Sequence, residues 1–534
     1  MKMVAGWFGW LASDLWLARA YANRHRIVCF RHMSFRHNYD RTEFSQDVSP
    51  KKILVQEDTG DPACVTITAH VYNMMRRSLT SLQARALRGV RRRLAAGAAA
   101  MDGAHAHSAP PSVSIAAAIP TSSCLACVGG RRRSRNFHSS PSAPSNEIPA
   151  SANVVIIGGG IIGTSVAYHL GKLGVPDVVL LEKDRLTSGT TWHAAGLINT
   201  FGSLSVTSTS MRRYTRDLYA NVLPEETGMD CGFLPVGFIE LAADGDRLEY
   251  YRRVAAFNRH CGVDVVEISP EEVKDRCPAV DVSDVLAGFY VEDDGRANPT
   301  DATMAFAKGA RMNGVRILEG VAIDRATTTA DEGGSLPKVT GVRLVSGETI
   351  KSNVVVNCAG MWARQLGQRN GVAIPNQAAE HYYLITEPSD AIDPSWPVVE
   401  DSSKCVYVRP EGGGLMLGLF ESMGAPWNAT ALDGIPEDFS FGEINPDWDR
   451  MGSYLEEAMK RVPMTESLGA KGAKKFFCGP ESFTPDGNPI VGEAAEVRNY
   501  YVAAGLNSIG ILTGGGGRRH PSAVDTRWRA SVGC

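Results

Sequence analysis

Apolar and polar residues follow a regular order from about residue 150, and this order predicts a strand, a helix and a second strand. Val154 to Ile157 form a continuous apolar run, which is typical of a buried parallel strand. From Ile162 to Leu173, apolar residues recur at the spacing of one helix face. A second apolar run, Val178 to Leu181, completes the pattern. We therefore expect the folded part of the chain to begin with a βαβ unit.

Glycines between the first strand and the helix indicate a dinucleotide site. Gly158, Gly160 and Gly163 stand in GxGxxG register, which lets backbone N–H groups at a helix N-terminus approach a pyrophosphate. Glu182 directly follows the second strand, where a carboxylate accepts hydrogen bonds from ribose hydroxyls. Position between two strands favours this interpretation over the alternative, a merely tight turn.

A different pattern occupies residues of about 231–301 and 376–475. Short segments such as "VGFIELA", "HYYLIT", "CVYVRP" and "GLMLGLF" alternate with turn residues, as in an antiparallel sheet. Strand alternation places Tyr407 and Arg409 on one face of this sheet. We expect the sheet to pack beside the nucleotide-binding part and to cover a substrate.

Composition narrows the function classes. The 55 Lys and Arg residues against 58 Asp and Glu residues give a net charge of −3, which offers no general attraction for nucleic acid or anionic lipid. No stretch approaches the roughly 20 apolar residues of a membrane span. Eleven scattered cysteines indicate reduced thiols, and the single CxxC pair, Cys124 and Cys127, supplies too few ligands for a structural metal site. We expect no metal.

Basic residues gather before the folded part. Residues 1–73 have no consistent periodicity and are left unassigned, as a possible gene-model extension. The stretch "MMRRSLTSLQARALRGVRRRLAAGAAAM" begins at residue 74 and has arginines but no acidic residue. Together with the Arg- and Ser-rich sequence that follows to residue 150, it predicts a disordered mitochondrial presequence. The alternative is a basic tail that binds an anion.

Several separated motifs resemble one family. They are "IIGGGIIGTSVAYHL", "VVLLEKDRLTSGTTWHAAGL", "VVVNCAGMWARQLG", "CGPESFTPDGNPIVGEA" and "GLNSIGILTGGGG". In this order they resemble the D-amino-acid-oxidase-type flavoproteins, and among these the sarcosine and dimethylglycine dehydrogenases. The resemblance implies an α/β fold, with a Rossmann-like FAD-binding domain and an inserted antiparallel β-sheet substrate domain (the D-amino acid oxidase or glutathione-reductase-2-like fold). The oxidoreductase domain would span 151–517, with FAD-binding parts at about 151–230, 302–375 and 476–517.

In the family that these motifs resemble, the histidine of the WHAAG motif is bonded covalently to the 8α carbon of the flavin, which here is His193. Imidazole is a nucleophile near neutral pH, and the small neighbours Gly189, Ala194, Ala195 and Gly196 leave room for the ring. The alternative is a packed histidine that hydrogen-bonds to the backbone.

Further cofactor contacts are expected at small-residue turns and at family positions. The turn after the strand around Val355 would bring backbone near the phosphates, a strand in "GVAIDRA" would meet the adenine, and "GLNSIGI" matches the family's loop over the pyrimidine end of the flavin. The full expected set is Gly158, Gly160, Ile161, Ile162, Gly163, Glu182, Lys183, Gly189, Thr190, Thr191, Trp192, His193, Ala194, Ala195, Gly196, Leu197, Val321, Ala359, Gly360, Asn507, Ser508, Gly510 and Ile511.

The resemblance also implies an amine substrate. By similarity to dimethylglycine oxidases, His381 and Tyr407 would line the amine pocket, and Arg409 could hold a substrate carboxylate in a bidentate contact. The expected reaction is oxidation of an N-methyl glycine to the demethylated amine and formaldehyde, with His381 as the base. Electrons would pass to electron-transferring flavoprotein in the mitochondrial matrix.

Departures from the family keep other functions open. Eukaryotic members continue into a folate-binding region, whereas residues 518–534 form an irregular tail, so we expect a truncated gene model and no folate partner. One alternative is a non-catalytic regulatory relative that resembles the pyruvate dehydrogenase phosphatase regulatory subunit, although that protein lacks a histidine in the WHAAG position. Another alternative is an amine or amino acid oxidase that reduces oxygen.

Overall fold

A computed structural model describes residues 147–329, 336–428, 434–469 and 473–516, and two short strands before them. Those strands, β1 (Ile53–Val55) and β2 (Ala63–Val65), pair in antiparallel fashion. They fall in a separate unit, Arg26–Ser145, whereas Asn146–Cys534 belongs to the main unit. Apart from these strands and residues 147–150, the predicted segments 1–73, 74–150 and 518–534 lie outside the described residues.

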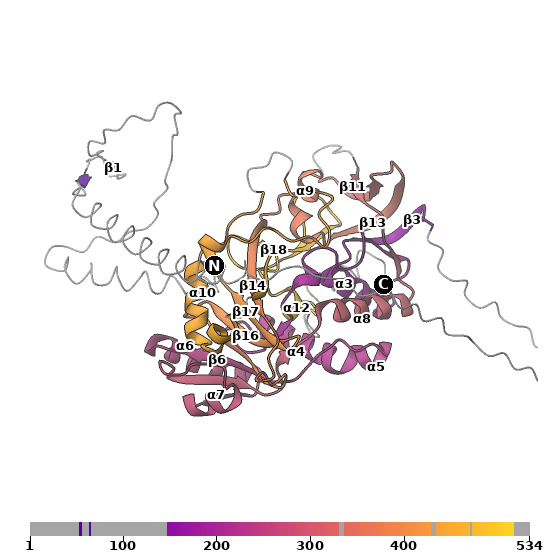
Figure 1. The fold of residues 1–534 in the computed structure, drawn as a ribbon. Coiled ribbons are helices and arrows are strands. Elements are labelled where there is room, and N and C mark those ends of the chain that lie inside the picture. Colours follow the sequence, from indigo (N-terminus) through magenta and orange to yellow (C-terminus); the bar gives the residue numbers. More distant parts are fainter. Residues whose placement is uncertain are drawn as a thin grey trace, which may run out of the picture. The chain divides into compact units, whose positions relative to one another are not determined.

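The first large sheet is built around the predicted βαβ unit (Figure 1). Its strands are β3 (Ser151–Ile157), β4 (Val178–Leu181), β10 (Arg316–Leu318), β11 (Ile323–Thr328), β12 (Val339–Leu344), β13 (Thr349–Asn357), β19 (Ile490–Glu493) and β20 (Tyr500–Ala504). β10, β4, β3, β13 and β20 are parallel neighbours. The predicted strands at Val154 to Ile157 and Val178 to Leu181 are therefore confirmed.

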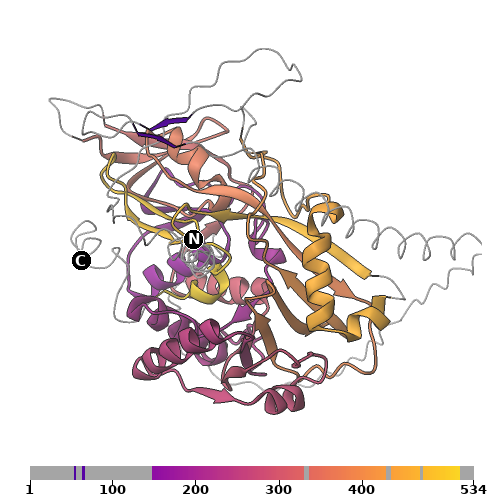
Figure 2. The same cartoon turned by 90° about the vertical axis from the view of Figure 1, so that its left-hand side faces the viewer.

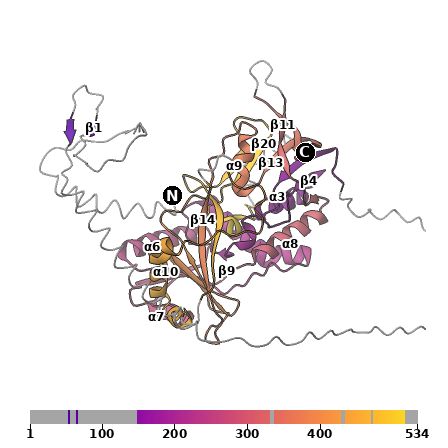
Figure 3. The ribbon, with the colours of Figure 1, turned by 45° about the horizontal axis from the view of Figure 1, so that its top comes forward.

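Two helices cover one side of this sheet. α3 (Ile161–Lys172) and α8 (Pro299–Met312) pack side by side, as Figure 3 shows. The predicted apolar stripe of α3 was only partly right: Leu170 is buried, but Ile162 and Val166 are half-buried. Leu173 follows the end of α3 and is exposed, because the most buried side of the helix carries Ile161 and Tyr168 instead. Small residues on α3 allow this close approach on more than one side. The other elements here are η1 (Thr191–His193), α4 (Val206–Asp217), η2 (Leu218–Val222), α5 (Leu223–Thr227), η3 (Gly360–Trp362), α9 (Ala363–Gln368) and α12 (Gly510–Thr513).

The second sheet has the order β18-β14-β17-β16-β15-β6-β8-β7. Its strands are β6 (Phe238–Ala242), β7 (Val265–Ile268), β8 (Ala287–Val291), β14 (Gln377–Thr386), β15 (Val398–Asp401), β16 (Val406–Glu411), β17 (Gly414–Leu419) and β18 (Ala473–Phe483). The expectation of a purely antiparallel sheet was wrong at one pair, since β15 and β6 are parallel. These strands are far apart in the sequence, so no hairpin constrains their direction.

The two faces of the second sheet differ. One face packs against α10 (Trp448–Arg461), the orange helix that lies along the sheet in Figure 2. Met451 and Ala458 of α10, and Val462 directly after it, belong to one buried cluster with the strand residues Val406, Val408 and Leu417. α7 (Pro270–Arg276) and α11 (Met464–Gly469) join this side. On the other face, α6 (Gly245–His260) covers β6, β7 and β8. The remainder of that face carries the predicted substrate residues.

Candidate functional site

Close backbone contacts require glycines in the loop after β3. Gly158 has φ +108°, and a Cβ there would lie 2.5 Å from the carbonyl oxygen of Cys358. A Cβ on Gly163, in the first turn of α3, would lie 1.9 Å from the carbonyl oxygen of Gly158. These contacts bring the ends of β3 and β13 to the start of α3. The arrangement is the one that a pyrophosphate cradle requires.

Glu182 lies beside this loop and stabilises it. Its Oε2 accepts a hydrogen bond of 2.6 Å from the Gly159 N–H, and its Oε1 accepts one of 2.9 Å from the Asp184 N–H. Burial raises the pKa of the Glu182 carboxyl, and the two N–H donors oppose that effect. A carboxylate oxygen accepts more than one hydrogen bond, so Glu182 retains capacity for a ribose hydroxyl.

The loop opens on a cavity of about 780 Å³, which is within the size range of cofactor sites. Most of the expected cofactor residues line this cavity: Gly158, Gly160, Ile161, Ile162, Glu182, Lys183, Gly189, Thr190, Thr191, Ala194, Val321, Ala359, Gly360, Asn507, Ser508, Gly510 and Ile511. Six expected residues do not line it, namely Gly163, Trp192, His193, Ala195, Gly196 and Leu197. Gly163 packs behind the loop. Trp192 and His193 stand between the lining residues Thr191 and Ala194, and the other three follow Ala194 in the chain.

Val321 was expected on a strand, and this expectation was wrong, because β11 begins only at Ile323. The Val321 N–H donates to the carbonyl of Glu182 at 2.8 Å instead of joining the ladder with β12. This contact fixes Val321 at the cavity wall, next to the end of β4.

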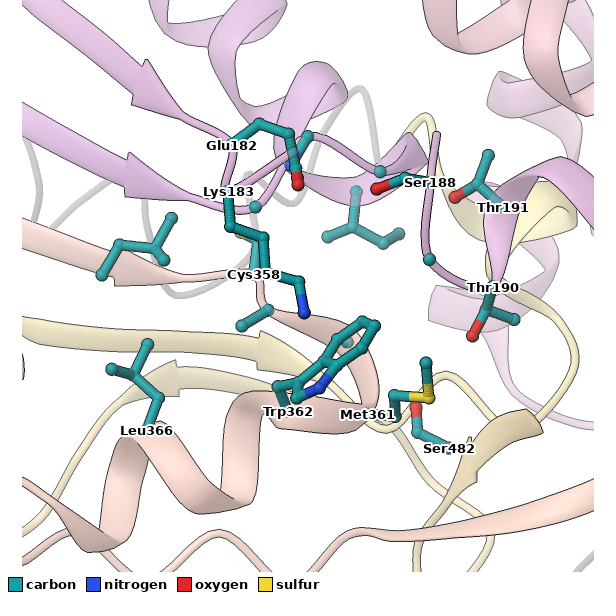
Figure 4. A pocket seen from close by; sticks show the side chains of 18 of the residues that line it. Glu182, Lys183, Ser188, Thr190, Thr191, Cys358, Met361, Trp362, Leu366 and Ser482 are labelled. Atoms are coloured by element: carbon teal, nitrogen blue, oxygen red, sulfur yellow. The ribbon is translucent and has the colours of Figure 1, made fainter. Parts of the chain in front are cut away.

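One side of the cavity is formed by residues 434–441, a segment that the sequence did not single out. The ammonium of Lys183 lies 3.6 Å from the ring centre of Trp362, and Figure 4 shows the two side chains together in the cavity. Trp362 Nε1 donates to the carbonyl of Pro436 at 3.0 Å, and the Phe441 N–H donates to the carbonyl of Ser188 at 2.9 Å. Residues 434–441 carry no periodic pattern, so only tertiary contacts place them here.

His193 is buried next to the cavity wall. Its side chain is 6% exposed, and its Nε2 has no hydrogen-bond partner among the residues that the structure describes. Its ring contacts Trp192 and Phe477, with centroids at 5.5 and 5.2 Å. Burial lowers the pKa of His193 to about 4, although the negative charge of Glu481 opposes this shift. The imidazole is therefore neutral near pH 7, the form in which a ring nitrogen is nucleophilic.

The second sheet brings His381 to His193. A Cβ on Gly479 of β18 would lie 2.7 Å from Cε1 of His193. His381 lies directly opposite Gly479 in the ladder between β14 and β18, and opposite residues share a face. The charge of His381 also contributes to the lowered pKa of His193.

Tyr407 and Arg409 extend the same face. The Tyr407 ring lies over Gly418, where a Cβ would be 1.8 Å from the tyrosine Cζ. Tyr407 and His381 both contact Phe420, with ring centroids at 5.9 and 4.6 Å. Arg409 lies two positions farther along β16 and interacts electrostatically with Tyr407. The structure thus brings the three predicted substrate residues and His193 together, although none of the four lines the 780 Å³ cavity.

Glu481 connects the cavity with this face and was missed from sequence. It lines the cavity, accepts a hydrogen bond from the Ser508 hydroxyl, and acts electrostatically on both His193 and Tyr407. It lies within the quoted "CGPESF" motif, but neither charge nor periodicity distinguished it there.

Two further carboxyls, Glu240 and Glu400, lie side by side in the pairing of β6 with β15. Asn199 Nδ2 and the Tyr251 hydroxyl donate to Glu240 at 2.7 and 2.9 Å. Burial raises the pKa of Glu240 to about 7, and burial together with the charge of Glu240 raises the pKa of Glu400. Ionisation of this pair is thus unfavourable in the folded protein.

This carboxyl pair predicts a pH dependence of stability. The folded-state pKa of Glu240 is higher than its pKa in the unfolded chain. The contribution of Glu240 to the free energy of unfolding is therefore fully present below about pH 4.5 and is lost as the pH rises through about 7. We expect Glu240→Gln to flatten this loss and to raise the unfolding temperature at pH 8 relative to the original protein. Thermal unfolding at pH 5.5 and 8 checks this; equal shifts in both proteins would contradict it.

The described residues form neither a metal cluster nor a membrane-spanning helix. In the ranges that the structure describes, no cluster of three or more His, Cys, Asp or Glu side chains is arranged for a metal ion. The predicted CxxC pair, Cys124 and Cys127, lies outside these ranges. Within the same ranges, no helix combines the length and apolar character that crossing a membrane requires.

The glycine cradle, its cavity and the adjoining sheet define a dinucleotide-binding α/β protein. A model of the family described as FAD dependent oxidoreductase matches residues 153–519, and the chain belongs to this family. Mitochondrial sarcosine dehydrogenase of Mus musculus is 37% identical over 376 residues, which cover 70% of this chain and 40% of that protein. The mitochondrial pyruvate dehydrogenase phosphatase regulatory subunit of Mus musculus is also 37% identical, over 72% of this chain and 42% of that protein.

Among solved structures, L-proline dehydrogenase from P. horikoshii matches with a TM-score of 0.59 and 25% identity, over 69% of this chain and 91% of that chain. The predicted fold class is therefore confirmed, with the mixed sheet noted above. The chain spans about two fifths of the length of the curated relatives it matches.

The residues present fit FAD. The absence of a Cβ at Gly158 and Gly163 lets β3, β13 and α3 approach closely, and the loop residues Gly158 and Gly160 line the cavity with their backbone. Nε2 of His193 is buried and has no partner among the described residues, and Thr191 and Ala194, on either side of His193 in the chain, line the cavity.

Proposed function

We propose that this protein oxidises an N-methyl amino acid such as sarcosine or dimethylglycine, with FAD bonded covalently to His193. The observation that carries the proposal is the neutral, unpartnered Nε2 of His193 on the sheet face that holds His381, Tyr407 and Arg409. His193 also interacts with backbone, as the alternative of a packed histidine expects, but that contact leaves Nε2 without a partner among the described residues. The relatives named sarcosine dehydrogenase support the substrate class.

The chemistry that FAD supplies when bound is acceptance of two electrons from the carbon next to the amine nitrogen. In balance, the N-methyl amine, water and oxidised FAD give the demethylated amine, formaldehyde and reduced FAD. The buried face of the second sheet excludes water and orients the amine. Side chains of this face take up the amine proton, position the amine and bind the substrate carboxylate.

His381 is the base in this proposal. A neutral imidazole nitrogen accepts a proton, so His381 can remove the proton of the substrate ammonium and leave the nitrogen lone pair free. Tyr407, fixed over Gly418, positions the amine beside His381. Arg409 offers N–H donors to the substrate carboxylate.

The acceptor and the location complete the proposal. We propose that electrons pass to electron-transferring flavoprotein and that the protein works in the mitochondrial matrix, in agreement with the presequence-like stretch from residue 74. The mitochondrial relatives support this location. Folate is not part of the proposal.

Anaerobic titration tests the activity. Sarcosine or dimethylglycine should bleach the flavin absorbance of the purified protein and release one formaldehyde per flavin reduced. Tyr407→Phe should slow this bleaching by roughly tenfold or more, because it removes a positioned hydroxyl next to the amine. Rapid-mixing absorbance measures both rates.

Three outcomes separate the alternatives. Flavin that stays oxidised with every N-methyl amino acid would contradict the proposal and favour a regulatory relative. Bleaching followed by rapid reoxidation in air, with hydrogen peroxide formed, would favour an oxidase over a dehydrogenase. Slow reoxidation in air with fast reduction of electron-transferring flavoprotein is the result that we expect.

A further inference from the structure

A second buried guanidinium, that of Arg296, lies close enough to Arg409 for their charges to interact. Arg296 belongs to β9 (Gly295–Arg296), which pairs with β5 (Leu197–Ile198), and β5 follows the His193 segment directly. The pairing places Arg296 opposite Leu197. The Gly237 N–H donates to the carbonyl of Asp294, and the Val398 N–H donates to the carbonyl of Gly237, so the start of β9 adjoins the start of β15. β15 pairs with β16, which carries Arg409, and the charge of Arg409 also acts on Arg296. The two arginines are 8% and 6% exposed.

The charges of these two arginines are not balanced by the chain. Arg409 Nη1 donates to Oε2 of Glu411 at 2.5 Å, which neutralises one guanidinium. Arg296 Nη2 donates only to a neutral acceptor, the carbonyl of Pro394, at 3.1 Å. Within the described ranges, Arg296 forms no ion pair, so one buried positive charge is left over.

Each arginine also has a nitrogen without a partner. Nη1 of Arg296 and Nε of Arg409 are buried, and neither has a hydrogen-bond acceptor among the described residues. Burial and the charge of Arg409 lower the pKa of Arg296 to about 10, which still leaves Arg296 charged at neutral pH. Buried donors without an acceptor are costly, and buried charges are normally paired. An anionic ligand would satisfy both deficits at once.

We infer that Arg296 and Arg409 together bind the carboxylate of the substrate, and that Arg296 supplies the charge that the carboxylate neutralises. A carboxylate presents two oxygens in one plane, which matches the N–H groups of guanidinium. Arg409 neighbours Tyr407 on β16, so a carboxylate held here leaves the amine of a short amino acid near Tyr407 and His381. The inference rests on the proposed function and narrows it: N-methyl amines without a carboxylate should be poor substrates.

Binding of a substrate-like carboxylate tests this assignment without turnover. Methoxyacetate has the skeleton of sarcosine with an ether oxygen in place of the nitrogen, and its amide, methoxyacetamide, lacks the charge. Titration of the flavin-loaded protein with each compound, followed by the change in flavin absorbance, gives the two dissociation constants. We expect methoxyacetate to bind saturably and methoxyacetamide to bind at least tenfold more weakly.

Arg296 variants locate the carboxylate. Arg296→Gln should weaken methoxyacetate binding roughly 10- to 100-fold, because a charge-assisted contact is lost, and should leave methoxyacetamide binding unchanged. Arg296→Lys retains a point charge and should fall between the two. Arg253→Gln is the matched control, because Arg253 is exposed on α6. This variant should bind methoxyacetate as tightly as the original protein does. Retained flavin in each variant reports folding.

Two results would overturn the inference: methoxyacetate binding that is unchanged in both Arg296 variants, or equal binding of the acid and its amide in the original protein. The test is separate from the amine oxidation itself. If methoxyacetate binds through Arg296 but no N-methyl amino acid reduces the flavin, the carboxylate site stands and the proposed reaction fails.

Discussion

Replacing Gly163 with alanine is expected to yield a protein that no longer retains FAD. The new Cβ would lie 1.9 Å from the carbonyl oxygen of Gly158, and both atoms belong to backbone that cannot move aside independently. Overpacking of this kind costs about 3 kcal/mol, which corresponds to a roughly 100-fold loss of affinity if the loop absorbs the strain. Flavin absorbance per protein after desalting measures the effect.

Gly452→Ala is the control for this substitution. Gly452 lies within α10, and a Cβ there would meet no atom within 4 Å. The control should therefore keep its full flavin content. Normal flavin content in Gly163→Ala would mean that the loop after β3 does not hold the cofactor's phosphates.

His193→Ala should bind FAD but release it on denaturation. The cradle around Gly158 is untouched by this change, so non-covalent binding should persist, whereas the only proposed point of attachment is removed. Acid precipitation should leave the pellet of the original protein yellow and that of the variant colourless. Loss of the nucleophile should abolish covalent flavin. Absorbance of the pellet should therefore fall by at least about 20-fold, to the limit of detection.

An exposed histidine provides the matched control for this second prediction. His260 ends α6 and is exposed, so His260→Ala should keep a yellow pellet. Anaerobic reduction of His193→Ala by sarcosine should also be slower, since attachment makes a flavin easier to reduce. A yellow pellet from His193→Ala would place the attachment at another residue.

Local sequence patterns predicted the elements that carry the cofactor cavity. The run Val154 to Ile157, the three glycines and Glu182 lie within about 30 residues, so backbone geometry and spacing determine their arrangement. Alternation along "CVYVRP" likewise placed Tyr407 and Arg409 on one face.

Residues that depend on distant contacts were not predictable. Arg296 comes to Arg409 only through the pairing of β5 with β9, and β6 meets β15 in parallel across a long sequence separation. The orphaned nitrogens of Arg296 and His193 are properties of packing, and neither composition nor periodicity reports them. Glu481 stood inside a recognised motif, but only the fold shows that it faces both His193 and the cavity.

The mass of the peptide that contains His193 tests the central claim most directly. Digestion of flavin-loaded protein, followed by mass spectrometry, should give the fragment with "TTWHAAGL" heavier by one FAD, and fragmentation should locate that added mass on His193. The same fragment at its unmodified mass, from protein that carries a full complement of flavin, would contradict the claim that His193 holds the cofactor covalently.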